Sequence, residues 1–278
     1  MKKLIYFIAA LFLFSCSETP SEKGIEKSKT KSASANDRSL DKAHKVIDTK
    51  LFDNGLVIDW YERGNGEAIK SGDVVDIDYK VRLKNGEIVD GNHLLELETF
   101  PFMVGFQMQT TGWDMAFQNL NVGDFARIKI PSHLARGEKG LGELIPPNAD
   151  NLLTVRIVKK RRPDRVVDGN KVWIIEENPK NKDKFGEGKE IEFHAMVSTS
   201  TNPIYANTFR SNQPFRFRLG DQGIVPGLRK ALINAKNSDR MYVLIPSSEA
   251  YGTQGYMKFV KPGEDLFYNI MVMNVSPK

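Results

Sequence analysis

The chain has 278 residues, of which 40% are hydrophobic and 27% are charged. This composition is ordinary for a soluble globular protein, and the length favours two domains over one. The formal net charge is +5, and two of the positive charges come from Lys2 and Lys3. A charge this small and this evenly spread does not predict a nucleic-acid-binding surface, so no nucleic-acid partner is expected.

The first residues of the chain have the organisation of a signal peptide. Lys2 and Lys3 form a short basic region, and an apolar run extends from Leu4 to Phe14. The run is shorter than the about 20 residues that a membrane-spanning helix needs, and it suits the apolar core of a signal peptide. We therefore expect residues 1–16 to be a signal peptide.

A single cysteine ends this segment. The stretch Leu13-Phe14-Ser15-Cys16 resembles the bacterial lipobox, in which a small residue precedes the cysteine that is lipidated. With Cys16 as the only cysteine, neither an intramolecular disulfide nor a zinc site built from thiolates can form. We expect a lipid on Cys16 to anchor the protein in the cell envelope, on the outer membrane, with periplasmic or surface-exposed domains. The alternative is an ordinary secretory signal with an incidental cysteine.

Residues 17–48 differ in composition from the remainder of the chain. They are rich in Lys, Ser, Glu and Asp and contain few large apolar side chains. Such a segment cannot bury enough apolar surface to offset the entropy lost on ordering. We expect a flexible tether between the anchor and the domains; a docked helix over Leu40–Val46 is the alternative.

Residues 49–162 have the pattern of a small domain made mostly of strands. Val75, Ile77, Tyr79 and Val81 alternate with polar residues, as in a strand with one buried face. Asn85-Gly86 then predicts a tight hairpin turn. Two further apolar stretches, 126–130 and 152–158, predict a second strand pair.

One short helix is predicted between these strands. Trp113, Ala116, Phe117 and Leu120 stand at positions i, i+3, i+4 and i+7, which places them on one apolar stripe. A sheet with one apolar face, covered by a single short helix, is an α+β domain.

Residues 163–278 repeat this domain. An offset of 115 residues carries Phe100–Gly105 onto Phe215–Gly220, Gly112-Trp113 onto Gly227-Leu228, Ile130-Pro131 onto Ile245-Pro246, and Ala135-Arg136-Gly137 onto Ala250-Tyr251-Gly252. Upstream the offset becomes 116, which indicates that one loop differs by one residue. Because the period is about one small domain, the pattern indicates a duplication and not a solenoid. The sequence therefore predicts two tandem α+β domains, each an antiparallel sheet wrapped around a short helix.

The ordered series of landmarks in the first repeat resembles the FKBP family of peptidyl-prolyl cis-trans isomerases. No single motif is specific, but each spacing in the series matches. The landmarks are Tyr79, Val89-Asp90, Phe100-x-Phe102-x-x-Gly105, Gly112-Trp113, Ile130-Pro131, Ala135-Arg136-Gly137 and Ile145-Pro146-Pro147.

The resemblance implies a shallow apolar pocket between the sheet and the helix. It implies that Tyr79, Asp90 and Trp113 are the catalytic residues, with Trp113 as the floor under the proline ring. Asp90 would supply a carboxylate dipole near the substrate carbonyl; the alternative is that it only hydrogen-bonds the hairpin. The substrate-binding residues that it implies here are Val89, Phe100, Phe102, Arg136, Ile145 and Leu153. Phe102 and Leu153 could equally be plain core residues.

Two positions of the first repeat depart from the family pattern. Val89 stands where the family has a phenylalanine, which shrinks one wall of the pocket. Arg136 replaces the tyrosine of Ala-Tyr-Gly, whose hydroxyl in the family donates to the bound peptide. Arg136 can still donate, but from a longer, flexible stem. It would either favour a peptide with an acidic neighbour or point into water.

The second repeat departs more strongly. Ala195, Ala206 and Leu228 replace the strand tyrosine, the aspartate and the helix tryptophan, so the second domain is expected to be degenerate. Its remaining substrate-binding candidates are Tyr205, Phe215, Phe217, Tyr251 and Tyr268.

No other chemistry competes with this interpretation. The four histidines have no ligand-like spacing, so no metal site is expected, and the reaction that the resemblance implies needs no cofactor. We expect a peptidyl-prolyl isomerase that acts on proline-containing polypeptides of the cell envelope, with catalysis in the first domain. The alternative is a non-catalytic chaperone or docking lipoprotein on the same scaffold.

Overall fold

The computed structural model describes residues 40, 44–177, 179 and 181–277. The predicted signal peptide at 1–16, its Cys16 and most of the predicted tether at 17–48 lie outside the described residues. The described part divides into two compact units. The first comprises the residues up to Ile69 together with Val75–Phe102 and Thr110–Lys160, and the second comprises Lys70–Val74, Met103–Gln109 and the residues from Arg161 onward.

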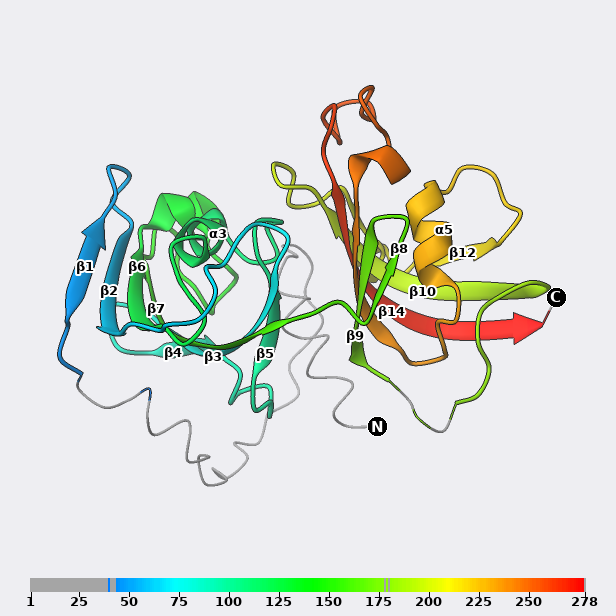
Figure 1. Ribbon diagram of the computed structural model, residues 1–278. Coiled ribbons are helices and arrows are strands. Elements are labelled where there is room, and N and C mark those ends of the chain that lie inside the picture. Colours follow the sequence, from blue (N-terminus) through cyan, green and yellow to red (C-terminus); the bar gives the residue numbers. More distant parts are fainter. Residues whose placement is uncertain (1–39, 41–43, 178, 180, 278) are drawn as a thin grey trace, which may run out of the picture. The chain divides into compact units, whose positions relative to one another are not determined.

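The elements of the first repeat form one seven-stranded sheet and one α-helix (Figure 1). Its strands have the order β1-β2-β6-β7-β3-β4, and β5 pairs with β3. The bounds are β1 (Asp48–Leu51), β2 (Val57–Glu62), β3 (Val74–Arg82), β4 (Ile88–Gly91), β5 (Phe100–Met103), α3 (Thr111–Phe117), β6 (Phe125–Ile130) and β7 (Asn151–Arg161), with short 3₁₀ turns at Ser132–Leu134 and Gly137–Lys139.

The second repeat has the same topology. Its seven-stranded sheet has the order β11-β10-β14-β13-β9-β8, with β12 paired to β10. Read from β8 to β11, this order matches that of the first sheet strand for strand. The bounds are β8 (Arg165–Val167), β9 (Asn170–Glu176), β10 (Lys189–Ser198), β11 (Ala206–Asn207), α4 (Thr208–Ser211), β12 (Phe215–Arg218), α5 (Pro226–Leu232), β13 (Arg240–Ile245) and β14 (Leu266–Pro277), with a 3₁₀ turn at Ser247–Glu249. The strands pair in the antiparallel sense, in the first unit at β1–β2, β2–β6, β6–β7 and β3–β4. In the second unit they do so at β8–β9, β9–β13, β13–β14, β10–β14, β10–β11 and β10–β12. The predicted fold class, two tandem α+β domains, is confirmed.

The helix of each unit packs closely against its sheet. Trp113, Ala116, Phe117 and Leu120 are all buried, although Leu120 lies just beyond the end of α3. A Cβ atom at Gly112 would lie 2.3 Å from Cγ2 of Ile130 on β6. No real Cβ approaches a neighbour that closely, so only glycine lets the start of α3 come so near to the sheet. Gly227 at the start of α5 is equally constrained, because its Cβ would lie 2.4 Å from Cγ2 of Ile245.

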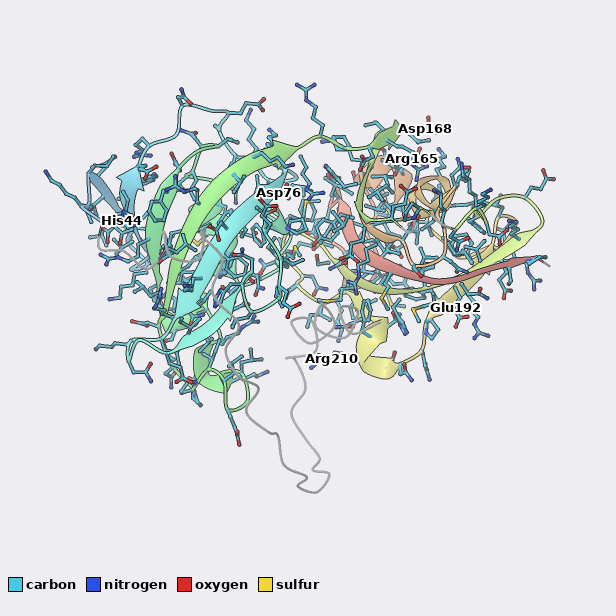
Figure 2. The ribbon with its side chains drawn as sticks, turned by 90° about the horizontal axis from the view of Figure 1, so that it is seen from below. His44, Asp76, Arg165, Asp168, Glu192 and Arg210 are labelled. Carbon is cyan, nitrogen blue, oxygen red and sulfur yellow. The ribbon has the colours of Figure 1, made fainter. Side chains whose placement is uncertain are left out.

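Strand β3 differs from its prediction. The alternating pattern predicted one buried face, but eight of its nine residues are buried, and these include Asp76, Asp78 and Lys80. The strand lies in the interior of the sheet, paired with β7, β4 and β5. Figure 2 labels Asp76 among the side chains. Its carboxylate has a partner on another strand, since the ammonium of Lys159 on β7 lies 3.4 Å away.

The predicted turn and strand pair are confirmed. Gly86 has a positive φ of 89°, its N–H donates to the carbonyl of Leu83, and the Asn85 side chain accepts from the N–H of Glu87. The stretches 126–130 and 152–158 lie in β6 and β7, which pair with each other. The second unit contains α4 in addition to the single expected helix, and the side chain of Asn207 caps it by accepting from the N–H of Arg210.

Each unit has a hydrogen-bonded loop that leads to its last strand. The loop spans residues 135–150 in the first unit and residues 250–265 in the second. In the first loop the N–H of Leu141 donates to Ile145 over 2.7 Å, and in the second the N–H of Tyr256 donates to Val260 over 2.8 Å. The entry to each loop is anchored alike, because the N–H of Ser132 donates to Asp150 and that of Ser247 to Asp265. The backbone of the loop is therefore fixed in the same way in both units.

Candidate active site

The first unit joins a tyrosine and an aspartate across the β3–β4 hairpin. The hydroxyl of Tyr79 donates to Oδ1 of Asp90 over 3.0 Å, and the N–H of Gly91 donates to the same oxygen over 2.8 Å. Burial raises the pKa of the Asp90 carboxyl above its ordinary value, while these two donors and the positive charge of Arg136 act in the opposite direction. Both donors belong to the β3–β4 hairpin, so the role of Asp90 toward a substrate stays a prediction beside the alternative that it only hydrogen-bonds the hairpin.

Aromatic rings surround this pair. The ring of Tyr79 meets Trp113 edge-on at a centroid distance of 5.3 Å and Phe100 at 5.6 Å. Phe102 lies 5.4 Å from Trp113, and Phe117 stacks on the other side of the cluster at 5.6 Å from the indole. The Trp113 side chain is only 2% exposed. Strands β3 and β5 and helix α3 thus bring four of the predicted residues into one aromatic cluster, joined to Asp90.

A buried asparagine holds the hairpin beside this cluster. Oδ1 of Asn92 accepts a hydrogen bond of 2.8 Å from the N–H of Tyr79. Its Nδ2 donates to the carbonyls of Leu97 and Glu98. Asn92 was not predicted from the sequence, because a lone asparagine after a strand is typical of many turns.

Arg136 is close enough to Asp90 for the two charges to influence each other. The residue is half-buried and stands just before the 3₁₀ turn at Gly137–Lys139. Burial lowers the pKa of its guanidinium, and the charge of Asp90 raises it. The guanidinium therefore lies in the electrostatic field of the carboxylate that accepts from the Tyr79 hydroxyl. Whether it points toward a substrate or into water stays a prediction.

The remaining predicted wall residues are buried. Val89, Phe102, Ile145 and Leu153 are all at most 5% exposed. Phe102 and Leu153 have no exposed surface at all, so they also serve as core residues. Their assignment as substrate contacts stays a prediction.

Thr110 is a candidate that the sequence did not single out. It precedes α3, its carbonyl accepts from the N–H of Trp113, and it is buried. Its hydroxyl has no hydrogen-bond partner among the described residues. A buried hydroxyl without a partner is costly, and one located a single helical turn from Trp113 is a candidate donor to a bound carbonyl. Its signal in the sequence is only a threonine before a helix, which usually indicates a cap.

The corresponding region of the second unit is built from tyrosines. The hydroxyls of Tyr205 and Tyr251 lie 2.7 Å apart, and the Tyr251 ring stacks on Tyr256 at 4.8 Å. Burial raises the pKa of Tyr205, as does its bond to Tyr251, and burial also raises the pKa of Tyr268. Both phenols therefore stay neutral at neutral pH.

Two predicted wall residues of the second unit have ring contacts with other phenylalanines and not with these tyrosines. Phe215 is 39% exposed and packs on Phe193 at 5.5 Å, while Phe217 is buried against Phe193 and Phe185. The replacements Ala195, Ala206 and Leu228 lie in or against the core of this unit. They bring no hydroxyl, carboxylate or indole to the positions that Tyr79, Asp90 and Trp113 occupy in the first.

The first site combines an aromatic cluster, a carboxylate that accepts from a phenol, and a guanidinium that feels the charge of this carboxylate. Within the described part of the chain, no three His, Cys, Asp or Glu side chains are grouped so that they could hold a metal ion. No helix there is both long and apolar enough to cross a membrane.

Comparison with known proteins places both units in one family. The family model for "FKBP-type peptidyl-prolyl cis-trans isomerase" matches residues 65–158 and again residues 181–273. Over 206 residues, 74% of this chain, the protein is 26% identical to human "Peptidyl-prolyl cis-trans isomerase FKBP10", and it covers 35% of that relative. This chain therefore spans about a third of the length of that relative.

A single-domain relative and a solved structure are also similar to this chain. "FK506-binding protein 1" of Candida glabrata is 34% identical over 112 residues, which are 40% of this chain and 97% of the relative. The "Crystal Structure of the 3 FKBP domains of wheat FKBP73" matches 81% of this chain and 97% of its own, with 21% identity and a TM-score of 0.41. With two matched domains that cover most of the chain, the protein belongs to the FKBP-type peptidyl-prolyl cis-trans isomerase family.

Proposed function

We propose that the first unit of this protein catalyses cis–trans isomerisation of Xaa-Pro peptide bonds. One observation supports the assignment to this unit above the others. Tyr79, Asp90 and Trp113 are joined by a hydrogen bond and a ring contact in the first unit, whereas the equivalent positions of the second are Ala195, Ala206 and Leu228.

The chemistry suits such a site. Rotation about a peptide bond is opposed by a barrier of about 18–20 kcal/mol, because the nitrogen lone pair is delocalised into the carbonyl. The twisted transition state loses this delocalisation, so its amide is less polar and its nitrogen is pyramidal. A site that fits the twisted form better than either planar isomer lowers the barrier. In this assignment the Trp113 indole supports the proline ring, and the aromatic walls exclude water from the amide.

The charged residues then bind the substrate carbonyl side. The Tyr79 hydroxyl fixes the orientation of the Asp90 carboxylate over 3.0 Å. The carboxylate dipole faces the carbon of the twisted carbonyl, while the Arg136 guanidinium donates to a carbonyl of the flanking peptide. No bond is made or broken, so the residues act only by shape, dipole and donated hydrogen bonds.

The substrates and location that we propose are based on the N-terminal sequence. A basic start, an apolar run and Cys16 support export and lipidation. The clients would then be proline-containing polypeptides of the cell envelope. Replacing Cys16 with alanine should release the protein from the membrane fraction of a bacterial host. Retention of the variant in that fraction would contradict the proposed anchor.

The isomerase assignment is tested with paired variants of the whole chain. Tyr79→Phe/Asp90→Asn removes the hydroxyl–carboxylate pair of the first unit, and Tyr205→Phe/Tyr251→Phe removes the hydroxyl pair of the second. Uncatalysed exchange takes tens to hundreds of seconds, so acceleration of a proline-containing tetrapeptide or of a proline-limited refolding reaction is measurable. We expect the first double variant to lose at least about tenfold in kcat/KM and the second to keep wild-type activity.

A non-catalytic role is the second candidate. It is favoured by Arg136, which stands in the field of Asp90 and has lost part of its hydration. If that guanidinium occupies the space above the indole, the first unit binds polypeptide chains without isomerising their prolyl bonds. Absence of acceleration by the wild-type chain at micromolar concentration would favour this role over catalysis.

A further inference from the structure

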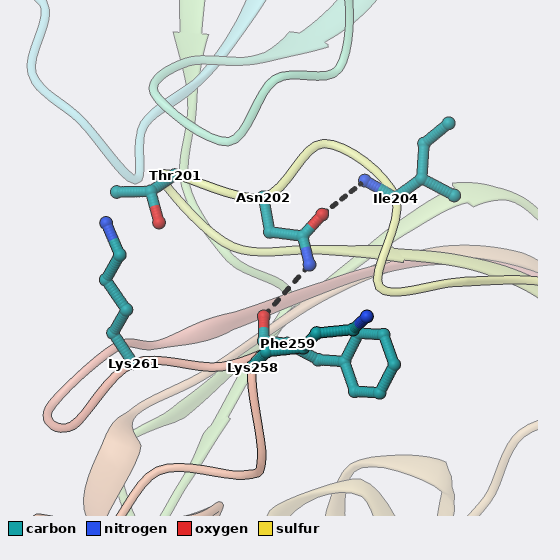
Figure 3. A pocket seen from close by; sticks show the side chains of 6 residues that line it. All are labelled: Thr201, Asn202, Ile204, Lys258, Phe259 and Lys261. Atoms are coloured by element: carbon teal, nitrogen blue, oxygen red, sulfur yellow. Dashed lines mark hydrogen bonds between the residues drawn. The ribbon is translucent and has the colours of Figure 1, made fainter.

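A cavity lies in the second unit between two loops (Figure 3). One loop comes after β10 and the other is the hydrogen-bonded loop before β14. The cavity has a volume of about 410 Å³, which is within the range of small-molecule and side-chain pockets. Its lining residues are Thr201, Asn202, Ile204, Lys258, Phe259 and Lys261.

The walls of this cavity are held in place by one asparagine. Nδ2 of Asn202 donates to the carbonyl of Phe259 over 2.9 Å, and its Oδ1 accepts from the N–H of Ile204 over 3.1 Å. Figure 3 shows both bonds spanning the cavity wall. The N–H of Asn202 also donates to the hydroxyl of Thr199. Because one side chain connects both loops, the cavity exists before any ligand arrives, and binding need not order it.

The rim of the cavity carries two exposed ammonium groups. Lys258 and Lys261 are both exposed, and within the described part of the chain neither forms a salt bridge. The nearby carboxylate of Glu264 is already engaged, since it accepts from the hydroxyl of Thr201 over 2.7 Å and from the N–H of Lys261 over 2.8 Å. The positive charges at the rim are thus available to a ligand.

The inner wall is aromatic and apolar. The Phe259 ring lies 6.1 Å from Tyr205 and 6.5 Å from Tyr256, and the Lys258 ammonium lies 5.9 Å above it. Ile204 lines the opposite side. Next to the rim, Met257 is 80% exposed and Tyr256 is 38% exposed. A cavity that combines the apolar side chains of Phe259 and Ile204 with a cationic rim fits an apolar side chain that is flanked by negative charges.

The first unit provides an internal contrast. Its equivalent loop has most of the same backbone hydrogen bonds. With the 115-residue offset, Glu143 is equivalent to Lys258 and Pro146 is equivalent to Lys261. At these two positions the first unit carries one negative charge and the second carries two positive charges. Other charged residues lie in both loops, among them Glu138 and Lys139 in the first and Glu264 in the second.

We propose that this cavity of the second unit binds an acidic segment of a partner polypeptide, with an apolar side chain seated against Phe259 and carboxylates beside Lys258 and Lys261. A polypeptide suits the site better than a bare anion, because Phe259 and Ile204 offer apolar contacts beside the two ammonium groups of the rim. The site is separate from the Tyr79–Asp90–Trp113 cluster, so the proposal does not rest on isomerase activity.

The probe for this site contains no proline, which separates it from the isomerase reaction. Fluorescein-labelled Glu-Glu-Phe-Glu-Glu is titrated with the whole chain, and its anisotropy is measured beside that of Lys-Lys-Phe-Lys-Lys and Glu-Glu-Gly-Glu-Glu. We expect binding of the acidic, phenylalanine-containing peptide alone. Raising the ionic strength from about 0.05 to about 0.3 M should weaken the binding, because exposed charges are screened.

Charge variants then locate the site. Lys258→Gln/Lys261→Gln should weaken binding of the acidic peptide by about fivefold or more, while the matched variant Lys171→Gln, at an exposed position on β9, leaves it unchanged. Both changes lie on the surface, and thermal unfolding verifies that the fold is kept. Asn202→Ala, which keeps both lysines, should also weaken binding because it releases the two loops from each other.

Three results would overturn the proposal. The first is equal binding of the acidic and basic peptides. The second is binding of the acidic peptide that the Lys258→Gln/Lys261→Gln variant leaves intact. The third is lysine-dependent binding of vesicles rich in anionic phospholipid together with no binding of the acidic peptide, because that would identify the ligand as a membrane surface.

Discussion

In the first unit the side chain of Asn92 accepts a hydrogen bond of 2.8 Å from the N–H of Tyr79, and in the second the hydroxyl of Thr208 accepts one of the same length from the N–H of Ala195. Asn92 and Thr208 are 116 residues apart, and they bind the equivalent backbone N–H with different side chains. The residues whose N–H they bind also differ, since Tyr79 hydrogen-bonds Asp90 and Ala195 packs in the core.

This contrast separates the frame of the fold from its chemistry. The strand topology, the close packing of the central helix and most of the loop hydrogen bonds are the same in both units, although only the second contains α4. The side chains that would contact a substrate differ at three of the principal positions. A backbone with this topology is therefore compatible with either set of side chains, and catalysis has to be sought in the side chains alone.

The largest effect is expected at the helix residue that differs between the units. Trp113→Leu gives the first unit the residue that the second has at Leu228, and we expect kcat/KM to fall about 100-fold because the floor of the site is lost. Leu228→Ala should leave the activity within about twofold. A tetrapeptide isomerisation assay measures both, with circular dichroism as the check on folding. Equal losses in the two variants would contradict the assignment of catalysis to the first unit.

The next effect tests the shared frame. Asn92→Ala leaves the N–H of Tyr79 and the carbonyls of Leu97 and Glu98 without their partner, and we expect it to lower the free energy of unfolding by about 2–3 kcal/mol. Thr208→Ala should cost about 1–2 kcal/mol for the same reason, and Thr208→Ser should restore most of it. Guanidinium unfolding measures these values. Only Asn92→Ala should also reduce isomerase activity, because only it displaces Tyr79.

A pH profile tests the Tyr79–Asp90 pair. Because burial raises the pKa of Asp90, the carboxylate takes up a proton at a higher pH than an ordinary aspartate, whose pKa is about 3.9. If the ionised form acts, activity falls as the pH decreases toward this raised value. Tyr79→Phe removes a donor that lowers the pKa, so the fall should begin at a still higher pH, with about a fivefold lower rate at neutral pH. Identical profiles for the two proteins would show that the pair does not act in the reaction.

A smaller effect is expected from Arg136. The wild-type protein should prefer a tetrapeptide with Glu before proline over one with Lys by about threefold, because the guanidinium is partly desolvated. Arg136→Tyr places the residue of the second unit, Tyr251, in the first and should abolish this preference. Lys129→Gln, at an exposed position on β6, serves as the control for a lost positive charge. The same preference in Arg136→Tyr would show that Arg136 does not contact the substrate.

The smallest effect concerns the second unit alone. Tyr205→Phe removes the 2.7 Å bond between the two phenols, and we expect the free energy of unfolding to fall by about 0.5 kcal/mol, since the pair is only partly buried. Isomerase activity should be unchanged. A clear loss of activity would show that the second unit takes part in catalysis.

Much of this fold is determined by local sequence patterns. The helices at Trp113 and Leu228, the Asn85-Gly86 turn and the pairing of β6 with β7 were all predictable, because each depends on spacing within a short segment. The buried polar face of β3 was not predictable. Asp76 is buried although the local pattern predicts that it faces water, and one of its partners, Lys159, is distant in sequence and close only in the folded chain.

The candidate site divides in the same way. The positions of Tyr79, Asp90, Phe100 and Trp113 are predictable from the ordered series of landmarks, and the structure brings them together. The roles of Asn92 and Thr110 could not be read from the sequence, because turns and caps use these residue types everywhere. The surroundings of Arg136 also depended on the fold, since neither its partial burial nor its closeness to Asp90 could be read from the sequence.

The glycines that begin α3 and α5 have a further consequence. Because Gly112 and Gly227 allow the main chain of each helix to rest almost directly on Ile130 and Ile245, neither helix can move inward when a larger or smaller side chain is placed on it. The distance between helix and sheet is then set by main-chain contact, and the residue at position 113 or 228 decides only how much of the space beside the helix is filled. Volume lost at this position becomes empty space that the surrounding structure cannot reclaim by a shift of the helix.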